Sequence, residues 1–263
     1  MMGVTRMFRS IVIPAIVIRR ERLGEEHKAL TLLTADRGLL SAVAWGAWKM
    51  RSRLATGSEP FTHCLVRLYH NPVKNTFKVT ELEVRESFEG LRRDLDRITA
   101  ASLWAEVCLR SIAAGELSAG LYRLLLDCLR LLERGTPAPY MTAQFLWRFL
   151  DLAGYRSDPC TCERCGRHLG DDEPARWVGA AGALRCAACA EPGAPPIGPG
   201  ARRYLERTQA MGLEAAAAVT LDGASLAGLT AGLRAMIRDV LETDLKSLSA
   251  GAGGKRPPAG ARR

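Results

Sequence analysis

The chain has 263 residues, 48% of them hydrophobic, and a formal net charge of +9. This length accommodates two small domains with folded cores together with a small metal module. The basic charge favours a polyanionic partner, either nucleic acid or an anionic membrane surface. No stretch approaches the roughly 20 apolar residues that span a bilayer, which excludes a transmembrane helix and a role within the membrane.

An apolar run at 11–18 follows Arg6 and Arg9 near the start of the chain, an order that loosely imitates a signal peptide. However, Arg19 and Arg20 follow the run at once, and a small-residue cleavage site is lacking. We therefore interpret the run as a β-strand and expect the protein to remain in the cytoplasm.

Residues 10–85 consist of short apolar stretches separated by turn signals at regular spacing. This pattern predicts a small antiparallel barrel or sandwich. The expected strands cover 10–20, 28–34, 39–48, 61–71 and 75–85. In the fifth, the buried phase changes between Val79 and Leu82, which predicts a β-bulge. Pro14 has no N–H and is expected at a strand start, an edge or a bulge.

Residues 1–85 hold most of the excess charge, with fourteen Lys or Arg against seven Asp or Glu. Aromatic and cationic residues interleave at 45–53. Aromatic faces stack on unpaired bases while cations follow the phosphates, which is typical of single-stranded nucleic-acid binding. The alternatives are that one tryptophan belongs to the core and that the loop is only solvated. The candidate DNA-binding residues are Arg19, Arg20, Arg37, Trp45, Trp48, Lys49, Arg51 and Arg53.

From about residue 87 the apolar period changes to 3.6, which predicts a helical domain with short connections. The apolar stripes run through Trp104, Cys108 and Ile112, from Leu117 to Leu132, and from Met141 to Leu150. After a Pro/Gly linker at 191–200, a short helix is expected at 201–210. A last helix from Leu226 to Leu241, with Asp222 or Ser225 as its N-cap, is expected to complete the helical core.

Four cysteines form two Cys-x-x-Cys pairs separated by twenty residues: Cys162 with Cys165, and Cys186 with Cys189. Each pair sits on a tight turn, and a hairpin can bring the two turns to one metal ion. The apolar runs 177–178 and 183–184, flanking a turn at 179–182, fit that hairpin. The spacing predicts one structural zinc ion (Zn²⁺), and because four thiolates leave no position for water, we expect it to do no chemistry.

Other readings of the cysteines are weaker. Cys160 and His168 lie close by, and either could replace a zinc ligand. Disulfides need an oxidising compartment, and a redox Cys-x-x-Cys usually stands alone near a βαβ unit. The remaining cysteines, Cys64, Cys108 and Cys128, fall at apolar positions and are predicted to be small core residues.

The sequence contains no phosphate loop, no Gly-x-Gly-x-x-Gly after a strand and no nucleophile elbow. The four histidines have no spacing that suggests a catalytic pair. We therefore do not expect an enzyme.

The order of these parts resembles the RecO family of bacterial recombination mediators. The stretch 15–54, AIVIRRERLGEEHKALTLLTADRGLLSAVAWGAWKMRSRL, is similar to the opening of that family. The stretch 145–169, FLWRFLDLAGYRSDPCTCERCGRHL, resembles its helix leading into the first cysteine pair. The match covers roughly residues 10 to 190.

The resemblance implies an α+β chain with an N-terminal oligonucleotide/oligosaccharide-binding (OB) fold and an α-helical domain into which a four-cysteine zinc ribbon is inserted. The expected parts are the barrel at 1–86, helices at 87–157, the zinc module at 158–191, helices at 192–248 and a disordered basic tail at 249–263.

The resemblance also implies binding to single- and double-stranded DNA and annealing of complementary strands. The implied partners are RecR, the C-terminal tail of the single-strand-binding protein, and indirectly RecA; the expected location is the nucleoid. The chain departs from the family in one respect, because Ser41 and Trp45 occupy positions where the family commonly has Lys or Arg. The main alternative is an RNA-binding or ribosome-associated zinc-ribbon protein, followed by a structural scaffold and, last, an enzyme.

Overall fold

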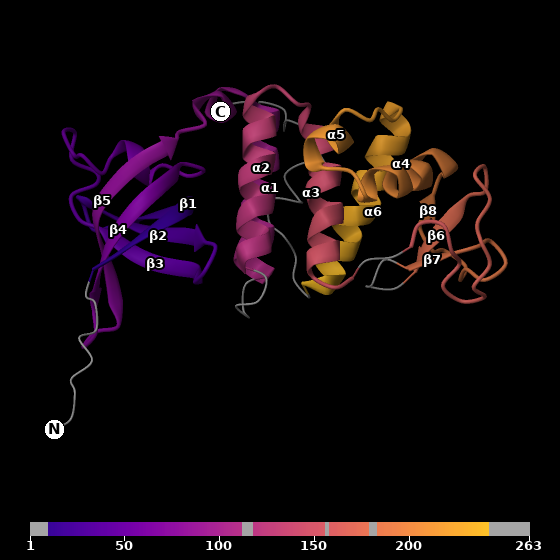
Figure 1. Cartoon of the computed structure of the whole chain (residues 1–263), viewed down its shortest axis with the longest axis horizontal. Helices are drawn as coiled ribbons and strands as arrows, with labels where there is room; N and C mark the ends of the chain where they lie inside the picture. Colours follow the sequence, from indigo (N-terminus) through magenta and orange to yellow (C-terminus); the bar gives the residue numbers. More distant parts are fainter. Residues whose placement is uncertain (1–9, 112–117, 156–157, 179–182, 242–263) are drawn as a thin grey trace, which may run out of the picture.

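The computed structural model describes residues 10–111, 118–155, 158–178 and 183–241. Three parts follow one another along its long axis: a β-barrel, a group of helices and a small three-stranded sheet (Figure 1). The predicted α+β class is confirmed. The barrel and the cysteine-bearing sheet lie at opposite ends of the molecule, so the helices separate the two sites predicted from the sequence.

Five strands close the barrel in the order β1-β2-β3-β5-β4. Their bounds are β1 Ser10–Leu23, β2 His27–Thr34, β3 Gly38–Ala44, β4 His63–Asn71 and β5 Thr76–Glu86. Neighbouring strands are antiparallel except β3 and β5, which run parallel where they close the barrel. Alternate side chains, including Leu30, Leu32 and Val66, fill the interior. This is the OB-like architecture that the resemblance implied.

The strand irregularities predicted from the sequence are present. Arg67 of β4 pairs with Glu81 of β5, but the next residue of β4 pairs with Val79, so Thr80 is the extra residue of a β-bulge. The bulge turns both Val79 and Leu82 toward the interior. Pro14 of β1 pairs with β4 on one side, but β1 begins to pair with β2 only at Ala15. The other side of Pro14 is therefore an unpaired strand edge, as predicted.

The third strand is shorter than predicted, since β3 ends at Ala44 instead of residue 48. The chain turns at Gly46, whose φ of 69° favours glycine, and the Gly46 N–H donates to Nδ1 of His27 at 3.0 Å. Residues 45–62, called the cap loop below, then cross one end of the barrel and include the 3₁₀-helix η1 (Thr56–Ser58).

The helical part is built around α3. The bounds are η2 Glu89–Arg93, α1 Leu95–Ser111, α2 Ser118–Glu133, α3 Ala138–Leu152, α4 Pro199–Gln209, α5 Leu213–Ala217 and α6 Gly223–Val240. Trp104 of α1 stacks on Phe145 of α3 with ring centroids 5.3 Å apart. Cys64, Cys108 and Cys128 are buried, as predicted. Ile112 and Leu117, assigned to stripes above, lie outside the described residues.

The C-terminal half corrects one prediction and confirms another. The stretch 191–200 is more than a linker, because it contains β8 (Pro196–Ile197) and the first two residues of α4. Ile197 is buried and pairs with Ala175, which holds this stretch in place. Asp222 is the N-cap of α6 and accepts the Ser225 N–H at 2.9 Å. The tail at 249–263 lies outside the described residues.

The small sheet has the order β7-β6-β8, with β6 Ala175–Val178 and β7 Ala183–Arg185. The predicted hairpin is present, and its turn at 179–182 lies outside the described residues. Arg202 of α4, only 2% exposed, anchors the sheet and its loops to the helices. Its guanidinium donates to the carbonyl oxygens of Pro159, Gly170 and Glu173.

Candidate nucleic-acid interface and metal centre

The cap loop is fitted closely to the end of the barrel. Gly57 lies against β5, so a Cβ added there would be 2.8 Å from Cβ of Leu82, and no larger residue fits without movement. The Gly57 carbonyl accepts the thiol of Cys64 at 3.4 Å. The loop therefore forms part of the barrel and is not a freely solvated connection.

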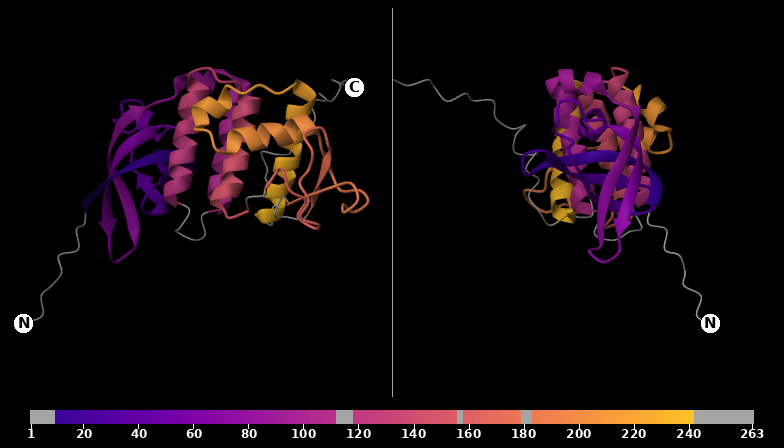
Figure 2. Two further views of the ribbon diagram at one scale, coloured as in Figure 1. Left: turned by 45° about the vertical axis from the view of Figure 1, so that its right-hand side comes forward. Right: turned by 90° about the vertical axis from the view of Figure 1, so that its left-hand side faces the viewer.

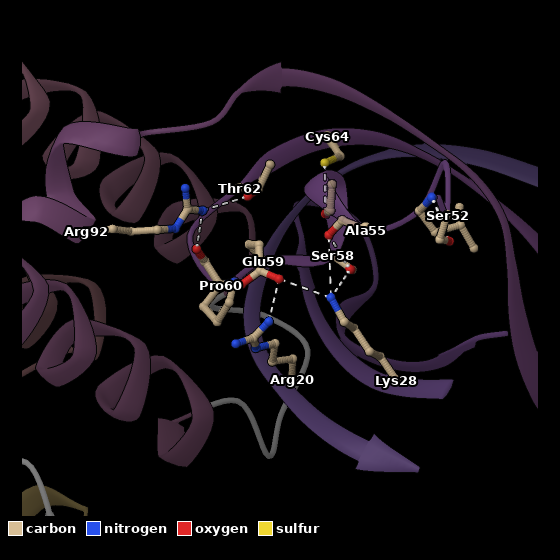
Figure 3. A network of polar contacts seen from close by, with 12 residues as sticks. Arg20, Lys28, Ser52, Ala55, Ser58, Glu59, Pro60, Thr62, Cys64 and Arg92 are labelled. Atoms are coloured by element: carbon tan, nitrogen blue, oxygen red, sulfur yellow. Dashed lines mark hydrogen bonds and ion pairs between the residues drawn. The ribbon is translucent and has the colours of Figure 1, made fainter. Parts of the chain in front are cut away.

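A buried lysine on β2 fixes the cap loop (Figure 3). Lys28 is 2% exposed, and its Nζ donates to Ser58 Oγ at 2.7 Å, to Glu59 Oε1 at 3.0 Å and to the Ala55 carbonyl at 3.5 Å. Arg20 of β1 contacts the same Glu59 oxygen. A buried ammonium is tolerated only when it is paired in this way. Lys28 was not among the functional residues predicted from the sequence. It lies two residues before Leu30 on the same strand, so its side chain points to the same, inward side of the barrel.

The two tryptophans of the cap loop are both at the surface, so the alternative that one belongs to the core is wrong. Ala47 takes the inward position between them. Trp48 is 42% exposed, but its ring contacts the Arg20 guanidinium at 4.9 Å and Lys28 Nζ at 4.6 Å. Such cation–π contacts are stabilising, and they give Trp48 a role within the protein. Trp45 is 51% exposed, and its ring meets that of His27 edge-on, with centroids 4.4 Å apart.

Three of the predicted DNA-binding cations are already paired within the protein. The pairs are Arg19–Glu21, Arg20–Glu59 and Lys49–Glu26. Lys49 Nζ lies 2.8 Å from Glu26, and its hydrogen bond lowers the pKa of that carboxyl below the usual value. A phosphate must compete with these carboxylates for the paired cations.

The other three predicted cations, Arg37, Arg51 and Arg53, are exposed and have no side-chain partner among the described residues. Arg51 and Arg53 lie in the cap loop near the tryptophans. Arg37 lies in the turn after β2, separated from His27 by the length of this eight-residue strand, roughly 23 Å. The predicted DNA-binding residues therefore do not form one surface, because Arg37 lies far from the cap loop.

The four cysteines of the two Cys-x-x-Cys pairs come together, with all sulfurs within 4.8 Å of one another. Tetrahedral zinc with four thiolates needs sulfurs about 3.8 Å apart, so this all-sulfur group fits such an ion. The N–H of Cys186 donates to Cys162 Sγ at 3.4 Å, which links the two turns directly. Gly166, at φ 70°, allows the first turn to close.

Backbone donors around the first cysteine of the cluster favour its thiolate form. Burial alone would raise the pKa of Cys162, but N–H donors from Cys186 and Cys165 lower it to about 6. Cys160 lies outside the group, and burial together with a hydrogen bond to Glu206 raises its pKa to about 12. His168 is exposed and is also absent from the group. Among the residues that the structure describes, the four cysteines are therefore the set that could hold a metal ion.

Comparison with known families accounts for nearly the whole chain. Residues 7–88 match the family model described as Recombination protein O N terminal, and residues 92–249 match Recombination protein O C terminal. The chain belongs to the RecO family. The prediction made from the order of parts is thus confirmed.

Relatives called DNA repair protein RecO match over most of their length. The RecO of Rubrobacter xylanophilus is 32% identical over 93% of this chain and 94% of its own. The RecO of a Roseiflexus species is 33% identical over 89% of this chain and 82% of its own length. The RecO of an Anaeromyxobacter species is 33% identical over 80% of this chain and 84% of its own length. No helix in the described ranges of this RecO protein is long and apolar enough to cross a membrane.

The two RecO matches meet where a polar joint connects the barrel to α2. Glu86, at the end of β5, accepts two hydrogen bonds from Arg130 at 2.8 and 2.9 Å. His63 of β4 bridges Glu86 to Tyr122, a second residue of α2, with Nδ1 2.9 Å from Glu86 Oε1 and Nε2 2.8 Å from the Tyr122 hydroxyl. Arg130, and then His63, hold the pKa of Glu86 below its usual value. We call these four residues the barrel–helix joint.

Proposed function

We propose that this RecO protein is a non-enzymatic mediator of DNA repair and recombination that acts in the cytoplasm, at the nucleoid. It binds single- and double-stranded DNA and anneals complementary strands. With RecR, it helps to load RecA onto DNA coated by single-strand-binding protein. Membership of a DNA repair family supports the general role, and the barrel surface supports the contact with DNA.

The observation that carries the proposal is a cap loop on an OB-like barrel that exposes Trp45 together with Arg51 and Arg53, two arginines without a side-chain partner among the described residues. Cations on such a surface neutralise phosphates and release counterions, which provides affinity without reading sequence. An exposed indole stacks on an unpaired base. Arg19, Arg20 and Lys49 extend this surface if phosphates displace their carboxylate partners, and Arg37 forms a separate contact.

Annealing needs no chemical step. The barrel gathers two strands by charge, lowers their mutual repulsion and leaves their base edges free to pair. Binding energy alone drives this process, so nucleotide hydrolysis is not required. This agrees with the absence of a phosphate loop in the sequence.

We assign one structural zinc ion to Cys162, Cys165, Cys186 and Cys189. Zinc supplies a fourfold crosslink there, which holds the two cysteine turns together. Arg202 then ties the base of the ribbon to α4, so the metal centre braces the helical part. In our proposal, the helical part receives the C-terminal tail of the single-strand-binding protein, and RecR completes the loading complex.

The test is annealing of two complementary labelled oligonucleotides coated with the cognate single-strand-binding protein, without ATP. We expect the protein to accelerate annealing. A protein that binds DNA but leaves the rate unchanged, with and without RecR, would contradict the mediator role. Competition between DNA and RNA of one sequence distinguishes the RNA-binding alternative, which requires that RNA wins.

A matched pair of variants tests the cap loop. R51A/R53A removes two unpaired cations, whereas R67A/R85A removes two cations that pair with Glu81 and Glu83 on the same barrel. Each double variant lowers the net charge equally. We expect R51A/R53A to weaken single-strand binding and to reduce the slope of log K against log salt by about 1.4, or about 0.7 per lost phosphate contact. An equal effect of both variants would mean that only net charge matters.

A further inference from the structure

A groove of about 500 Å³ lies where α6 passes beside the small sheet (Figure 2). Its sheet side is formed by Trp177 of β6 together with Pro195 and Pro196 at β8. Its helix side is a row of residues with little or no side chain, from Gly228 to Ala235. Ligand sites commonly have this size and an apolar lining of this kind. We call it the ribbon groove.

Glycines on α6 set the shape of the ribbon groove. A Cβ added at Gly232 would lie 2.6 Å from Nε1 of Trp177, so the helix approaches the indole this closely only because residue 232 has no side chain. At Gly228, about one turn earlier, an added Cβ meets nothing within 4 Å. The groove is therefore narrow at Gly232 and open at Gly228.

The Trp177 indole has a buried donor without an acceptor. The residue is only 4% exposed, and its N–H has no hydrogen-bond partner among the described residues. Buried tryptophan N–H groups usually find an acceptor, and one that lacks a partner requires an explanation. Nε1 faces Gly232, which lines the groove. An occupant that supplies a carbonyl oxygen there would satisfy this donor after a small movement of the ring.

Asp239 gives one rim of the ribbon groove a negative charge. Its side chain is exposed and has no ion pair within the described ranges. The last carbonyl groups of α6, which ends one residue later at Val240, add partial negative charge at the same place. No lysine or arginine lines the groove in the part of the chain that the structure describes. The rim therefore favours an occupant that carries cations beside an apolar portion.

The chain continues from this rim into a stretch with that composition. Residues 249–263 contain four basic and no acidic residues, and the sequence at 255–258 is Lys-Arg-Pro-Pro. The steps from Leu241 to Lys255 span at most about 46 Å, whereas the side of α6 from Gly228 to Asp239 is about 17 Å long. The segment 255–258 can therefore reach the whole groove. Proline-containing segments bind in aromatic-lined grooves because their extended backbone is already formed.

We propose that the ribbon groove binds residues 255–258 of the same chain, with Pro257 and Pro258 against Trp177 and the adjoining cations near Asp239. The attachment through α6 raises the effective concentration of the segment to the millimolar range, so weak contacts are sufficient to hold it. Docking keeps the basic charge of 249–263 at the end of the molecule opposite the barrel (Figure 1). The inference concerns the arrangement of the chain and does not depend on the proposed role in DNA repair.

The first experiment follows the indole N–H signal of Trp177 by nuclear magnetic resonance in the full-length protein, with W177F to assign the signal. We expect P257A/P258A to move the Trp177 signal, because the donor loses its acceptor. The core residue Trp104 provides the reference signal, which should stay in place. R262A/R263A, which changes the same stretch outside 255–258, is the matched control and should leave the Trp177 signal unchanged.

The second experiment measures binding of a labelled peptide of residues 249–263 to a chain that ends at residue 248. We expect binding, and we expect a peptide with alanine in place of Pro257 and Pro258 to bind about tenfold more weakly. Gly228→Leu in the receiving chain fills the open part of the groove and should weaken binding to a similar extent. This variant is expected to fold, because its Cβ has free space and leucine favours a helix over glycine.

Each contrary result is specific. If P257A/P258A leaves the Trp177 signal in place, or if Gly228→Leu binds the peptide as tightly as the parent chain, the segment does not occupy the ribbon groove. A Trp177 signal that depends on protein concentration would mean that the segment of a second copy binds instead, which also overturns the proposal. None of these results affects the mediator role, which the annealing assay tests separately.

Discussion

Lys28 Nζ lies 2.7 Å from Ser58 Oγ, so a charge carried by β2 fastens the loop that follows β3. The same ammonium lies beneath the ring of Trp48. The shape of the cap loop therefore depends on a buried cation more than on the exposed arginines that first attract attention in the sequence.

Replacing Lys28 by methionine should destabilise the protein. The variant keeps the bulk of the side chain but removes its hydrogen bonds to Ser58 and Glu59, and we expect a loss of about 1–3 kcal/mol in the free energy of unfolding. Urea unfolding at neutral pH measures this loss. Lys49→Met, which breaks an exposed pair with Glu26, is the control and should change stability by less than about 1 kcal/mol. Equal effects would show that the buried network is unimportant.

Zinc binding should depend on the four clustered cysteines and not on Cys160. We expect Cys186→Ser to lose the metal and lower the melting temperature, because a structural zinc site contributes directly to folding. Cys160→Ser should retain one zinc ion per chain. Metal content by elemental analysis, together with melting curves before and after chelation, distinguishes the two variants. Loss of zinc from Cys160→Ser alone would mean that the ligand set is misassigned.

Acid should loosen the barrel–helix joint. The pKa of Glu86 is lower in the folded protein than its usual value of 4.5, chiefly because Arg130 donates to it. The stabilisation is therefore fully present above pH 4.5 and is lost as the pH falls through the folded-state pKa. Glu86→Gln should reduce stability at pH 7 and flatten its decline below pH 5. Denaturation across this range tests the joint, with Glu89→Gln, an exposed partner of Arg93, as the control.

Arg202 should not be replaceable by lysine. Its planar guanidinium serves three carbonyl oxygens at once, which a single ammonium cannot reach in the same geometry. We expect Arg202→Lys to cost about 1–3 kcal/mol, since buried acceptors lose charged donors. The adjacent Arg203→Lys, at an exposed pair with Asp172, should be nearly neutral. Proteolysis of the ribbon, followed over time, would show whether the anchor is released.

Local patterns in the sequence predicted much of this structure. The phase change between Val79 and Leu82 correctly indicated a bulge, and the two cysteine pairs indicated the cluster, because each is set by neighbours in the chain. The end of β3 was missed because it depends on Gly46 meeting His27 across the turn. The strand at Pro196–Ile197 was missed because two residues carry no period and pair with distant Ala175.

The candidate nucleic-acid surface was harder to predict, because it too depends on contacts between residues far apart in the chain. Composition identified a basic, aromatic stretch, but only tertiary contacts show which cations are already neutralised and which tryptophan is engaged. Trp45 and Trp48 look equivalent in the sequence, yet one meets His27 and the other covers Lys28.

The return of α6 onto α3 has a consequence for synthesis on the ribosome. Tyr140 at the start of α3 bonds the Leu221 carbonyl just before α6, so the helical core joins segments emerging far apart in time. The barrel can close once β5 has emerged, whereas the side of α3 that packs against α6 stays uncovered until the last helix is made. A nascent chain stalled at the ribbon is thus expected to combine a protease-resistant barrel with helices that chaperones bind.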